Sequence, residues 1–395
     1  MTTANAYDLA TKDLDPPFAV IDLAAFDANA GDLLRRAAGV PIRVVSKSVR
    51  CRHLLRRVLA MDGFSGLMCY SLSEALWHVE AGTSDDILVG YPTVDHRGLG
   101  ELAADERARA AITIMIDSTE HLDIVDAAAG HGHPEIRVCL ELDSSWRPVG
   151  LPVPHVGTRR SPVFTPRQAA RLAREVVARK GFRLVGMMGY EGQIAGVPDA
   201  TGKPADTVVR WMQRRSAAEL ARRRAEAVRR VRAITELEFV NGGGSGSIET
   251  TRAEPAVTEV AAGSGLIGSM LFDRYTRFRP RPAALFALPV VHKPAPRIAT
   301  VFAGGYIASG PVSATHLPTP YLPAGLRLLR VEGAGEVQTP VAGETARDLR
   351  LGDRVWFRHA KAGELAERFT EYHLVVDGQV ERTVPTYRGE GRSFG

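Results

Sequence analysis

Two glycine-rich segments and one early lysine are the residues best suited to chemistry. Asn241-Gly-Gly-Gly-Ser-Gly-Ser247 and Gly263-Ser-Gly-Leu-Ile-Gly-Ser269 each follow a strand-like run. Glycine lets backbone N–H groups approach a ligand closely, and such a segment ahead of a helix can hold a phosphate group. Lys47 comes at the end of another strand-like run, much earlier in the chain. A lysine amine can form a Schiff base with an aldehyde. A phosphate site with a lysine beside it favours pyridoxal phosphate as the ligand.

These residues need a scaffold that brings distant strand ends together. The chain alternates between helical stretches and eight short β-rich runs, at residues 42–45, 66–70, 86–89, 112–116, 136–142, 183–188, 237–240 and 257–261. Eight β/α units predict an α/β fold closed into a (β/α)8 TIM barrel, whose active site forms at the carboxyl ends of the strands. Lys47 and both glycine segments would meet there, since the loops after strands 7 and 8 are the usual phosphate site.

Each of these features has a simpler interpretation, which the sequence leaves open. Lys47 can be a surface lysine at a strand end, and the glycine segments can be tight turns without a ligand. Gly263-x-Gly-x-x-Gly268 also matches the dinucleotide-binding pattern, which belongs in an early βαβ unit with an acidic residue about 20 positions later. Here the pattern follows the last predicted barrel strand, so we favour phosphate binding at the barrel mouth.

The sequence pattern changes near Arg279-Pro-Arg-Pro282. Beyond it prolines and glycines are frequent, helical periodicity is absent, and short β-rich runs favour an antiparallel all-β domain. These runs are residues 285–291, 297–302, 326–332, 335–340, 354–359, 371–376 and 380–383. We therefore expect a cofactor-binding barrel over residues 1–280 and a C-terminal β domain over residues 281–395, with strand 18–22 at their junction.

Further polar side chains follow the predicted strands. Tyr190 and Glu191 come directly after strand 6 and would project at the mouth, where a tyrosine can stack on a cofactor ring or bond its phosphate. The alternative is a loop anchor. Asp143 and Arg147 follow strand 5 and can orient cofactor or substrate. The loop that comes next adds Arg159 and Arg160.

One candidate cluster lies in the predicted β domain. His359, Lys361 and Glu364 occur within six residues of one another. Acid–base work or metal ligation is conceivable for such a set, whereas a single histidine on a strand is more often structural. The sequence leaves both interpretations open.

Composition and charge exclude several function classes. The 395 residues are 45% hydrophobic and 24% charged, which is typical of a globular protein, and no apolar run approaches the ~20 residues of a membrane span. The N-terminal residues lack the basic and apolar regions of a signal peptide. Three widely spaced cysteines favour the reducing cytoplasm over a disulfide framework. The net charge of +5 is most concentrated in residues 210–232, which we interpret as a solvated helix and not as a nucleic-acid site.

Taken together, the motifs resemble those of the fold-type III pyridoxal-phosphate enzymes, the alanine racemase barrel superfamily, and within it the D-threonine aldolase and D-serine dehydratase branch. The order of motifs carries the resemblance. It runs from Val44-Val-Ser-Lys47 through Tyr190-Glu191-Gly192 to the glycine loops Gly242 to Gly246 and Gly263-Ser264-Gly265. The ending, Arg354 to Phe369, is similar to the bacterial amino acid deaminase/aldolase subgroup.

The resemblance implies roles for individual residues. Lys47 would carry pyridoxal phosphate as an internal aldimine, and Lys47 and His359 would move protons. The expected contacts of the cofactor are Lys47, Tyr190, Gly243, Gly244, Ser245, Gly246, Gly263, Ser264 and Gly265, to which we add Arg147. The implied activity is that of a lyase on a small, D-configured hydroxy amino acid. Because family members are commonly homodimers, we expect a cytoplasmic homodimer without nucleic-acid or membrane partners.

Three departures from the family pattern matter. D-threonine aldolases usually read Tyr-Glu-Gly-His, but here Gln193 takes the place of that histidine. The branch binds a divalent metal through His-x-Asp or His-x-Cys, whereas this chain has His359-Ala360-Lys361, so we expect no tight metal site. A tyrosine commonly follows Gly-Ser in the second glycine loop, and here that position is Gly265.

Two other functions stay open at this point. A racemase on the same scaffold would need a second base, which in alanine racemases is a tyrosine of the β domain. Four tyrosines lie in that region, namely Tyr306, Tyr321, Tyr372 and Tyr387. A non-catalytic pyridoxal-phosphate-binding protein would share the barrel, but those proteins lack a β domain, so residues 281–395 argue against it.

Overall fold

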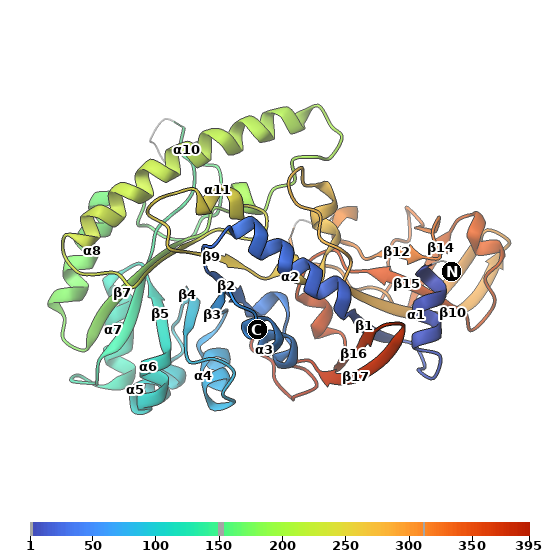
Figure 1. Ribbon diagram of the computed structural model, residues 1–395, viewed down its shortest axis with the longest axis horizontal. Helices are drawn as coiled ribbons and strands as arrows, with labels where there is room; N and C mark the ends of the chain where they lie inside the picture. The colour runs from blue at the N-terminus through green and yellow to red at the C-terminus, as the bar shows by residue number, and fades with distance from the viewer. Residues whose placement is uncertain (1–2, 149–153, 311–312) are drawn as a thin grey trace. The chain divides into compact units, whose positions relative to one another are not determined.

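The computed structural model describes residues 3–148, 154–310 and 313–395, without the side chains of residues 3–5. Two compact units divide the chain. The barrel unit consists of Leu33–Lys47, the described part of Leu55–Gly263, and Phe394–Gly395. The sheet unit consists of the described residues up to Asp32, Ser48–Leu54, and those of Ser264–Ser393. Figure 1 shows the elements of both units along the chain.

The barrel unit is built on eight parallel strands that close on themselves, counted over the described residues. They are β2 (Ile42–Val45), β3 (Phe64–Cys69), β4 (Ile87–Pro92), β5 (Ile112–Ile116), β6 (Ile136–Glu141), β7 (Phe182–Gly189), β8 (Phe239–Gly242) and β9 (Glu259–Ala262). The barrel closes where β2 pairs with β9, with Ile42 opposite Val260. The predicted TIM barrel is therefore confirmed, and each predicted strand overlaps an observed one.

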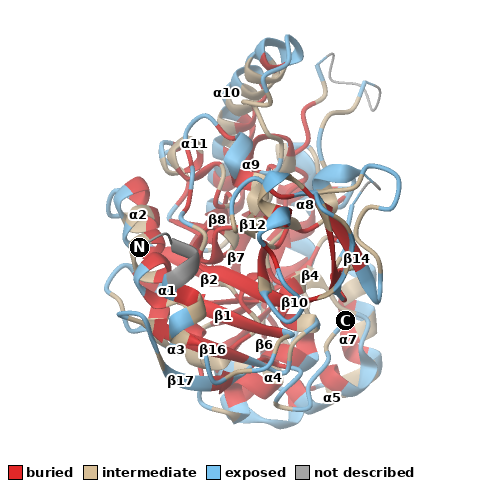
Figure 2. Cartoon of the chain, turned by 90° about the vertical axis from the view of Figure 1, so that its right-hand side faces the viewer, coloured by how far each residue is buried: buried red, intermediate tan, exposed pale blue. Residues whose placement is uncertain are grey.

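The barrel strands are rich in aliphatic side chains because both of their faces are buried (Figure 2). Inside the barrel, side chains from successive strands form one layer, made up of Met68, Leu88, Met115, Cys139, Val185, Met188, Phe239 and Ala261. A second set is charged. Arg43 donates to Glu259 at 2.7 Å and to Asp86 at 2.9 Å, so its buried guanidinium is paired. This packing fixes the strand ends that carry the candidate site.

The helices of the barrel unit follow the strands. They are α4 (Leu72–Glu80), α5 (His96–Ala104), α6 (Glu106–Ala111), α7 (Thr119–Ala129), α8 (Pro166–Ala178), α9 (Gly192–Ala195), α10 (Ala205–Arg232) and α11 (Ile248–Arg252). Helix α8 begins at a capping box between Thr165 and Gln168, with Pro166 in its first turn. Helices α8 and α10 lie side by side (Figure 1). Helices α2 (Leu23–Ala37) and α3 (Arg52–Leu59) contain residues of both units.

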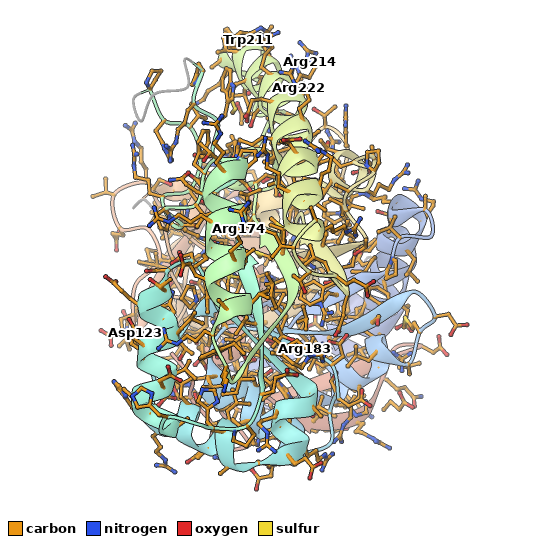
Figure 3. All side chains as sticks on the ribbon, turned by 90° about the vertical axis from the view of Figure 1, so that its left-hand side faces the viewer. Asp123, Arg174, Arg183, Trp211, Arg214 and Arg222 are labelled. Carbon is orange, nitrogen blue, oxygen red and sulfur yellow. The ribbon has the colours of Figure 1, made fainter. Side chains whose placement is uncertain are left out.

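The prediction of a solvated basic helix over residues 210–232 is confirmed only in part by helix α10. Trp211, Arg214 and Arg222 are exposed and project from its outer surface (Figure 3). Arg223 and Arg224, in contrast, are buried. No helix in the described part of the chain has the length and apolar character that a membrane span requires.

The sheet unit contains a nine-stranded sheet within the described residues. Its strands are β1 (Phe18–Asp22), β10 (Ala284–Ala295), β11 (Ile298–Phe302), β12 (Thr319–Leu322), β13 (Arg327–Leu328), β14 (Gln338–Ala342), β15 (Arg354–Arg358), β16 (Glu371–Val376) and β17 (Gln379–Pro385). Strand β1 pairs antiparallel with β10 and parallel with β16, so the first strand of the chain belongs to this sheet. Helix α1 (Thr3–Ala10) contributes Tyr7, whose ring contacts Trp356.

Candidate active site at the mouth of the barrel

Lys47 lies directly beyond β2, in a short 3-10 turn at Ser46–Ser48. Its Nζ atom donates a hydrogen bond of 2.6 Å to the hydroxyl of Tyr91, which lies near the end of β4. Both residues are half-buried. Because the barrel strands are parallel, these two carboxyl ends share the mouth where barrel active sites form. The structure thus places Lys47 as predicted and adds Tyr91, which the sequence analysis did not single out.

Arg160 connects Tyr91 with Tyr190. Its guanidinium carbon lies 5.3 Å from the ring centroid of Tyr91 and 5.1 Å from that of Tyr190, within the range of cation–π attraction. Burial raises the pKa of Tyr190 to about 12, although the Arg160 charge opposes the shift. Tyr190 therefore stays protonated near neutral pH and can donate a hydrogen bond. Two tyrosines and one exposed arginine stand with Lys47 at the mouth.

The first glycine loop leaves β8 next to Tyr190. Gly243 has a φ of 86°, a conformation that side chains rarely adopt. A Cβ atom at Gly244 would lie 3.3 Å from the Tyr190 ring and 3.1 Å from the Cβ of Ala195. The hydroxyl of Ser245 accepts a long hydrogen bond of 3.4 Å from the N–H of Gly263, at the start of the second glycine segment. The close approach explains why the loop requires glycine.

The structure corrects the expected position of the Glu191 side chain, which the sequence analysis placed at the mouth. The residue is 1% exposed and lies behind the glycine loop. Its carboxylate accepts hydrogen bonds from the N–H of Gly243 at 3.1 Å, from Ser247, and from the hydroxyl of Thr251. Glu191 thus anchors the glycine loop, because one carboxylate holds both the loop backbone and the start of α11.

Arg224 supplies the positive charge that this buried carboxylate needs. It extends from α10 and contacts Glu191 at 3.1 Å and Glu254 at 2.9 Å. Burial raises the pKa of Glu254 to about 7, against the opposing effect of Arg224 and with a contribution from Glu191. The cluster of Glu191, Arg224 and Glu254, here called the loop anchor, therefore couples α10 to the glycine loop. Sequence reasoning missed it because Arg224 stands in a run of arginines that predicts a solvated surface.

Glu141 is a second group near the mouth that the sequence did not reveal. It ends β6 and is 4% exposed. Burial raises the pKa of Glu141 to about 7; Arg160 opposes the shift, and Asp117 and Asp143 add to it. A carboxyl group that titrates near neutral pH beside Arg160 can act as an acid or a base. Its signal in the sequence was weak, since Asp143 and Arg147 were the more conspicuous residues of the segment.

Comparison with known proteins identifies the family. The family described as alanine racemase, N-terminal domain, matches residues 21–270. The chain belongs to this family. The cofactor of this family is pyridoxal phosphate, and the residues above suit it. They provide an amine at a strand end, a glycine loop whose backbone a phosphate can approach closely, and aromatic rings between the two.

The relatives narrow the branch. The chain is 29% identical over 296 residues to a D-threonine aldolase from Arthrobacter sp, covering 72% of this chain and 70% of that protein. It is 24% identical over 256 residues to a 3-hydroxy-D-aspartate aldolase from Paracoccus denitrificans, covering 64% of this chain and 60% of the relative. The crystal structure of D-threonine aldolase from Filomicrobium marinum matches with a TM-score of 0.80 at 24% identity, over 95% of this chain and 96% of that one. The chain therefore lies in the D-threonine aldolase branch of the family.

Gln193 and Arg147 have structural partners in the barrel unit. The Gln193 amide donates to the carbonyl oxygen of Ser144 at 2.7 Å and to the hydroxyl of Ser216 at 2.8 Å. Arg147 donates to Asp143 at 2.7 Å, and its guanidinium carbon lies 4.0 Å from the ring centroid of Phe164. These contacts hold Gln193 in α9, which follows β7, and Arg147 in the segment that follows β6.

His359 and Lys361 belong to the sheet unit. His359 directly follows β15 and is 4% exposed, and burial together with the Arg358 charge lowers its pKa to about 3. Its imidazole is therefore neutral at physiological pH. Lys361 donates to the carbonyl oxygen of Ser309 at 2.9 Å. An ammonium group has no lone pair for a metal, so this pair does not fit the divalent ion of the family pattern.

Metal-type ligands do gather elsewhere in the described residues. Cys69, Glu74 and His78 lie together, buried, where β3 leads into α4. The Glu74 carboxylate accepts the N–H of Tyr70 at 2.8 Å, so it already serves the start of the helix. This group does not include His359.

The low pKa of His359 predicts a measurable pH dependence of stability. The unfolded chain takes up a proton near the ordinary histidine pKa of 6.5, whereas the folded chain does so near a pKa of 3, so folding is penalised as the pH falls between these values. At pH 5 the cost is about 2 kcal/mol, since one pKa unit is worth about 1.36 kcal/mol. We therefore compare the free energy of unfolding in urea at pH 7.5 and at pH 5. Between these pH values the wild type is expected to lose about 2 kcal/mol more stability than His359→Gln. The exposed His96 provides the control, His96→Gln. Equal pH dependence in all three proteins would contradict the burial argument.

Proposed function

We propose that this protein is a pyridoxal-phosphate-dependent lyase that cleaves a small, D-configured hydroxy amino acid. The observation that carries the proposal is the continuous set of contacts from Lys47 through Tyr91, Arg160 and Tyr190 to the loop at Gly244. It provides an amine, an aromatic wall and a glycine loop at one end of one barrel. The kinship with aldolases supports the same reaction class.

Each part of the site has a proposed role. Lys47 binds the cofactor aldehyde through its amine, and the loop around Gly244 offers backbone N–H groups to the phosphate. The proposed cofactor contacts are Lys47, Tyr190, Gly243, Gly244, Ser245, Gly246, Gly263, Ser264, Gly265 and Arg147. When bound, pyridoxal phosphate withdraws electrons from the substrate and weakens the bonds at its α-carbon.

Three groups of this chain can move protons for the reaction. Lys47 offers an amine at the mouth, and Glu141 is a carboxyl group whose pKa is raised to about 7. His359 keeps a neutral imidazole, since its pKa is lowered to about 3, and a neutral imidazole has one donor and one acceptor nitrogen through which a proton can be relayed. We propose Lys47 and His359 as catalytic residues, and the loop anchor as the support of the phosphate loop.

A substrate panel tests the proposal. D-threonine, D-3-hydroxyaspartate and D-serine are incubated with the enzyme beside their L-forms, and aldehyde, ammonia and optical rotation are followed. Release of an aldehyde or of ammonia from a D-form is the expected result. Loss of optical activity without either product would contradict the lyase and favour a racemase, which has less support because the relatives above are aldolases. No reaction with any amino acid would contradict both.

We further propose that catalysis does not depend on a divalent metal. Lys361, two residues after His359 in the sequence, carries positive charge at the position where the family pattern has a second metal ligand, and its ammonium donates to the carbonyl oxygen of Ser309. Activity of chelator-treated enzyme is expected to change less than about twofold on addition of Mn²⁺, Co²⁺ or Zn²⁺. A large, saturable activation by any of these ions would overturn this expectation.

Assembly, location and domain boundaries complete the proposal. We propose a cytoplasmic homodimer with a cofactor-binding domain over residues 1–280 and a β domain over residues 281–395, where β1 of the first segment contributes a strand to the sheet of the second. Sedimentation of the purified protein gives the mass of the particle, for which twice the chain mass of 42.7 kDa is expected. A particle with the mass of one chain would contradict the dimer.

A further inference from the structure

Tyr91 belongs to the candidate site, but the proposed function assigns no role to its hydroxyl group. Across the sheet, Val45 of β2 pairs with Met68 of β3, and Met68 pairs with Leu88 of β4. Lys47 follows Val45 by two residues and Tyr91 follows Leu88 by three, so both side chains start at a similar height, with β3 between their strands. Two strand spacings amount to about 10 Å between the backbones. A long lysine and a tyrosine can bridge that gap, and their polar ends meet at 2.6 Å.

The surroundings of Tyr91 bring positive charge to its ring. The Nζ atom of Lys47 and the guanidinium carbon of Arg160 each lie 5.3 Å from the ring centroid. Arg160 also lies 5.1 Å from the ring centroid of Tyr190, which follows β7, and its charge opposes the raised pKa of Glu141 at the end of β6. The phenol hydroxyl is thus directed at the one amine that the proposed function makes reactive.

We propose that Tyr91 is the residue that positions the Lys47 amine and exchanges protons with it, an inference that rests on the proposed function. A phenol can both accept and donate a proton. When Lys47 is an ammonium, one Nζ–H bond breaks as an O–H bond forms on Tyr91. The original hydroxyl proton of Tyr91 passes to water. Tyr91 ends unchanged, Lys47 is left as a neutral amine, and one proton has moved.

The Tyr91→Phe variant isolates the hydroxyl, because it keeps the ring against Arg160. Loss of an acid–base partner is expected to lower kcat by about 10²-fold, with a smaller change in KM. A second readout needs no substrate. Stripped protein is mixed with pyridoxal phosphate over a range of pH, and the growth of visible absorbance from lysine-bound cofactor is timed. The variant is expected to load at least about tenfold more slowly, with a displaced pH profile.

The Tyr91→Leu variant separates the hydroxyl from packing, since it removes the ring as well. Slow loading in both variants, with melting temperatures close to the wild type, supports the role of the hydroxyl. Normal loading and kcat in Tyr91→Phe overturn it, whether or not Tyr91→Leu is impaired. If the wild-type protein gains no visible absorbance with pyridoxal phosphate, the proposed function fails and this inference fails with it. The wild-type arm therefore distinguishes the two failures.

Discussion

Replacement of Arg224 by methionine is expected to lower the free energy of unfolding by about 3–5 kcal/mol, the usual result when one partner of a buried ion pair is removed. Arg224 is the cation between Glu191 and Glu254. Without it, two buried carboxylates face each other, and at least one must take up a proton. The glycine loop is expected to loosen too, because Glu191 receives the N–H of Gly243. Cofactor affinity should therefore fall along with stability.

The loss of stability in Arg224→Met is expected to depend on pH. The pKa of Glu254 is raised to about 7 even with Arg224 present, so the folded state binds more protons than the unfolded state between about pH 4.5 and 7. Stability is therefore lost as the pH rises through this window. Removing Arg224 takes away the charge that opposes the shift, and the defect should be larger at pH 8 than at pH 6.

A matched control exists on the same helix. Arg222 lies two residues before Arg224 and is exposed (Figure 3). Arg222→Met removes the same charge from the same helix and is expected to change stability by less than about 0.5 kcal/mol. Urea unfolding and pyridoxal-phosphate titration of both variants compare them directly. Equal behaviour of the two variants would show that the loop anchor has no special role.

Replacement of Lys47 by alanine is expected to have the largest effect on activity. The variant lacks the amine that binds the cofactor and returns protons, so activity should fall about 10³-fold or more, given that a single acid–base group is worth 10²–10⁴-fold. The fold should persist, since Lys47 is half-buried beyond the end of β2 and not in the layer that fills the barrel. Visible absorbance of the bound cofactor should also disappear.

Lys180 provides the control for that experiment. It is an exposed lysine beyond the end of α8, and Lys180→Ala should keep wild-type activity and absorbance. A Lys47→Ala variant with activity near that of Lys180→Ala would contradict the assignment of Lys47. Melting temperatures of both variants show whether a loss of activity has a structural cause.

The barrel could be predicted from sequence because its signals are local. Each strand from β2 to β9 is a short apolar run bounded by turns or helices, and the closure of eight such units follows from their number. Strand β12 was missed because Pro320, which cannot donate to the ladder, interrupts its pattern. The length of the run at residues 326–332 was also overestimated, since only Arg327–Leu328 pairs in the sheet.

The site residues could be predicted where the residue type and its local sequence indicate a role. They could not be predicted where the role depends on a contact with a residue far away in the sequence. Lys47 and the glycine loop are visible in the sequence alone. Tyr91 reads as the end of a strand, and only the fold brings it to Lys47, 44 positions away. Arg224 resembles its exposed neighbours in the helix, and its burial follows from the packing around the glycine loop. Glu191 is conspicuous in sequence, but the direction of its side chain was not.

The attachment of pyridoxal phosphate to Lys47 is tested most directly by locating the bound cofactor chemically. Purified protein is loaded with pyridoxal phosphate, treated with borohydride to make the lysine attachment permanent, digested, and analysed by mass spectrometry. One modified peptide, which contains Lys47, is expected from the wild-type protein, and it should be absent from Lys47→Ala. Modification of a different lysine, or no modification of a protein that is folded and saturated with the cofactor, would contradict the central claim.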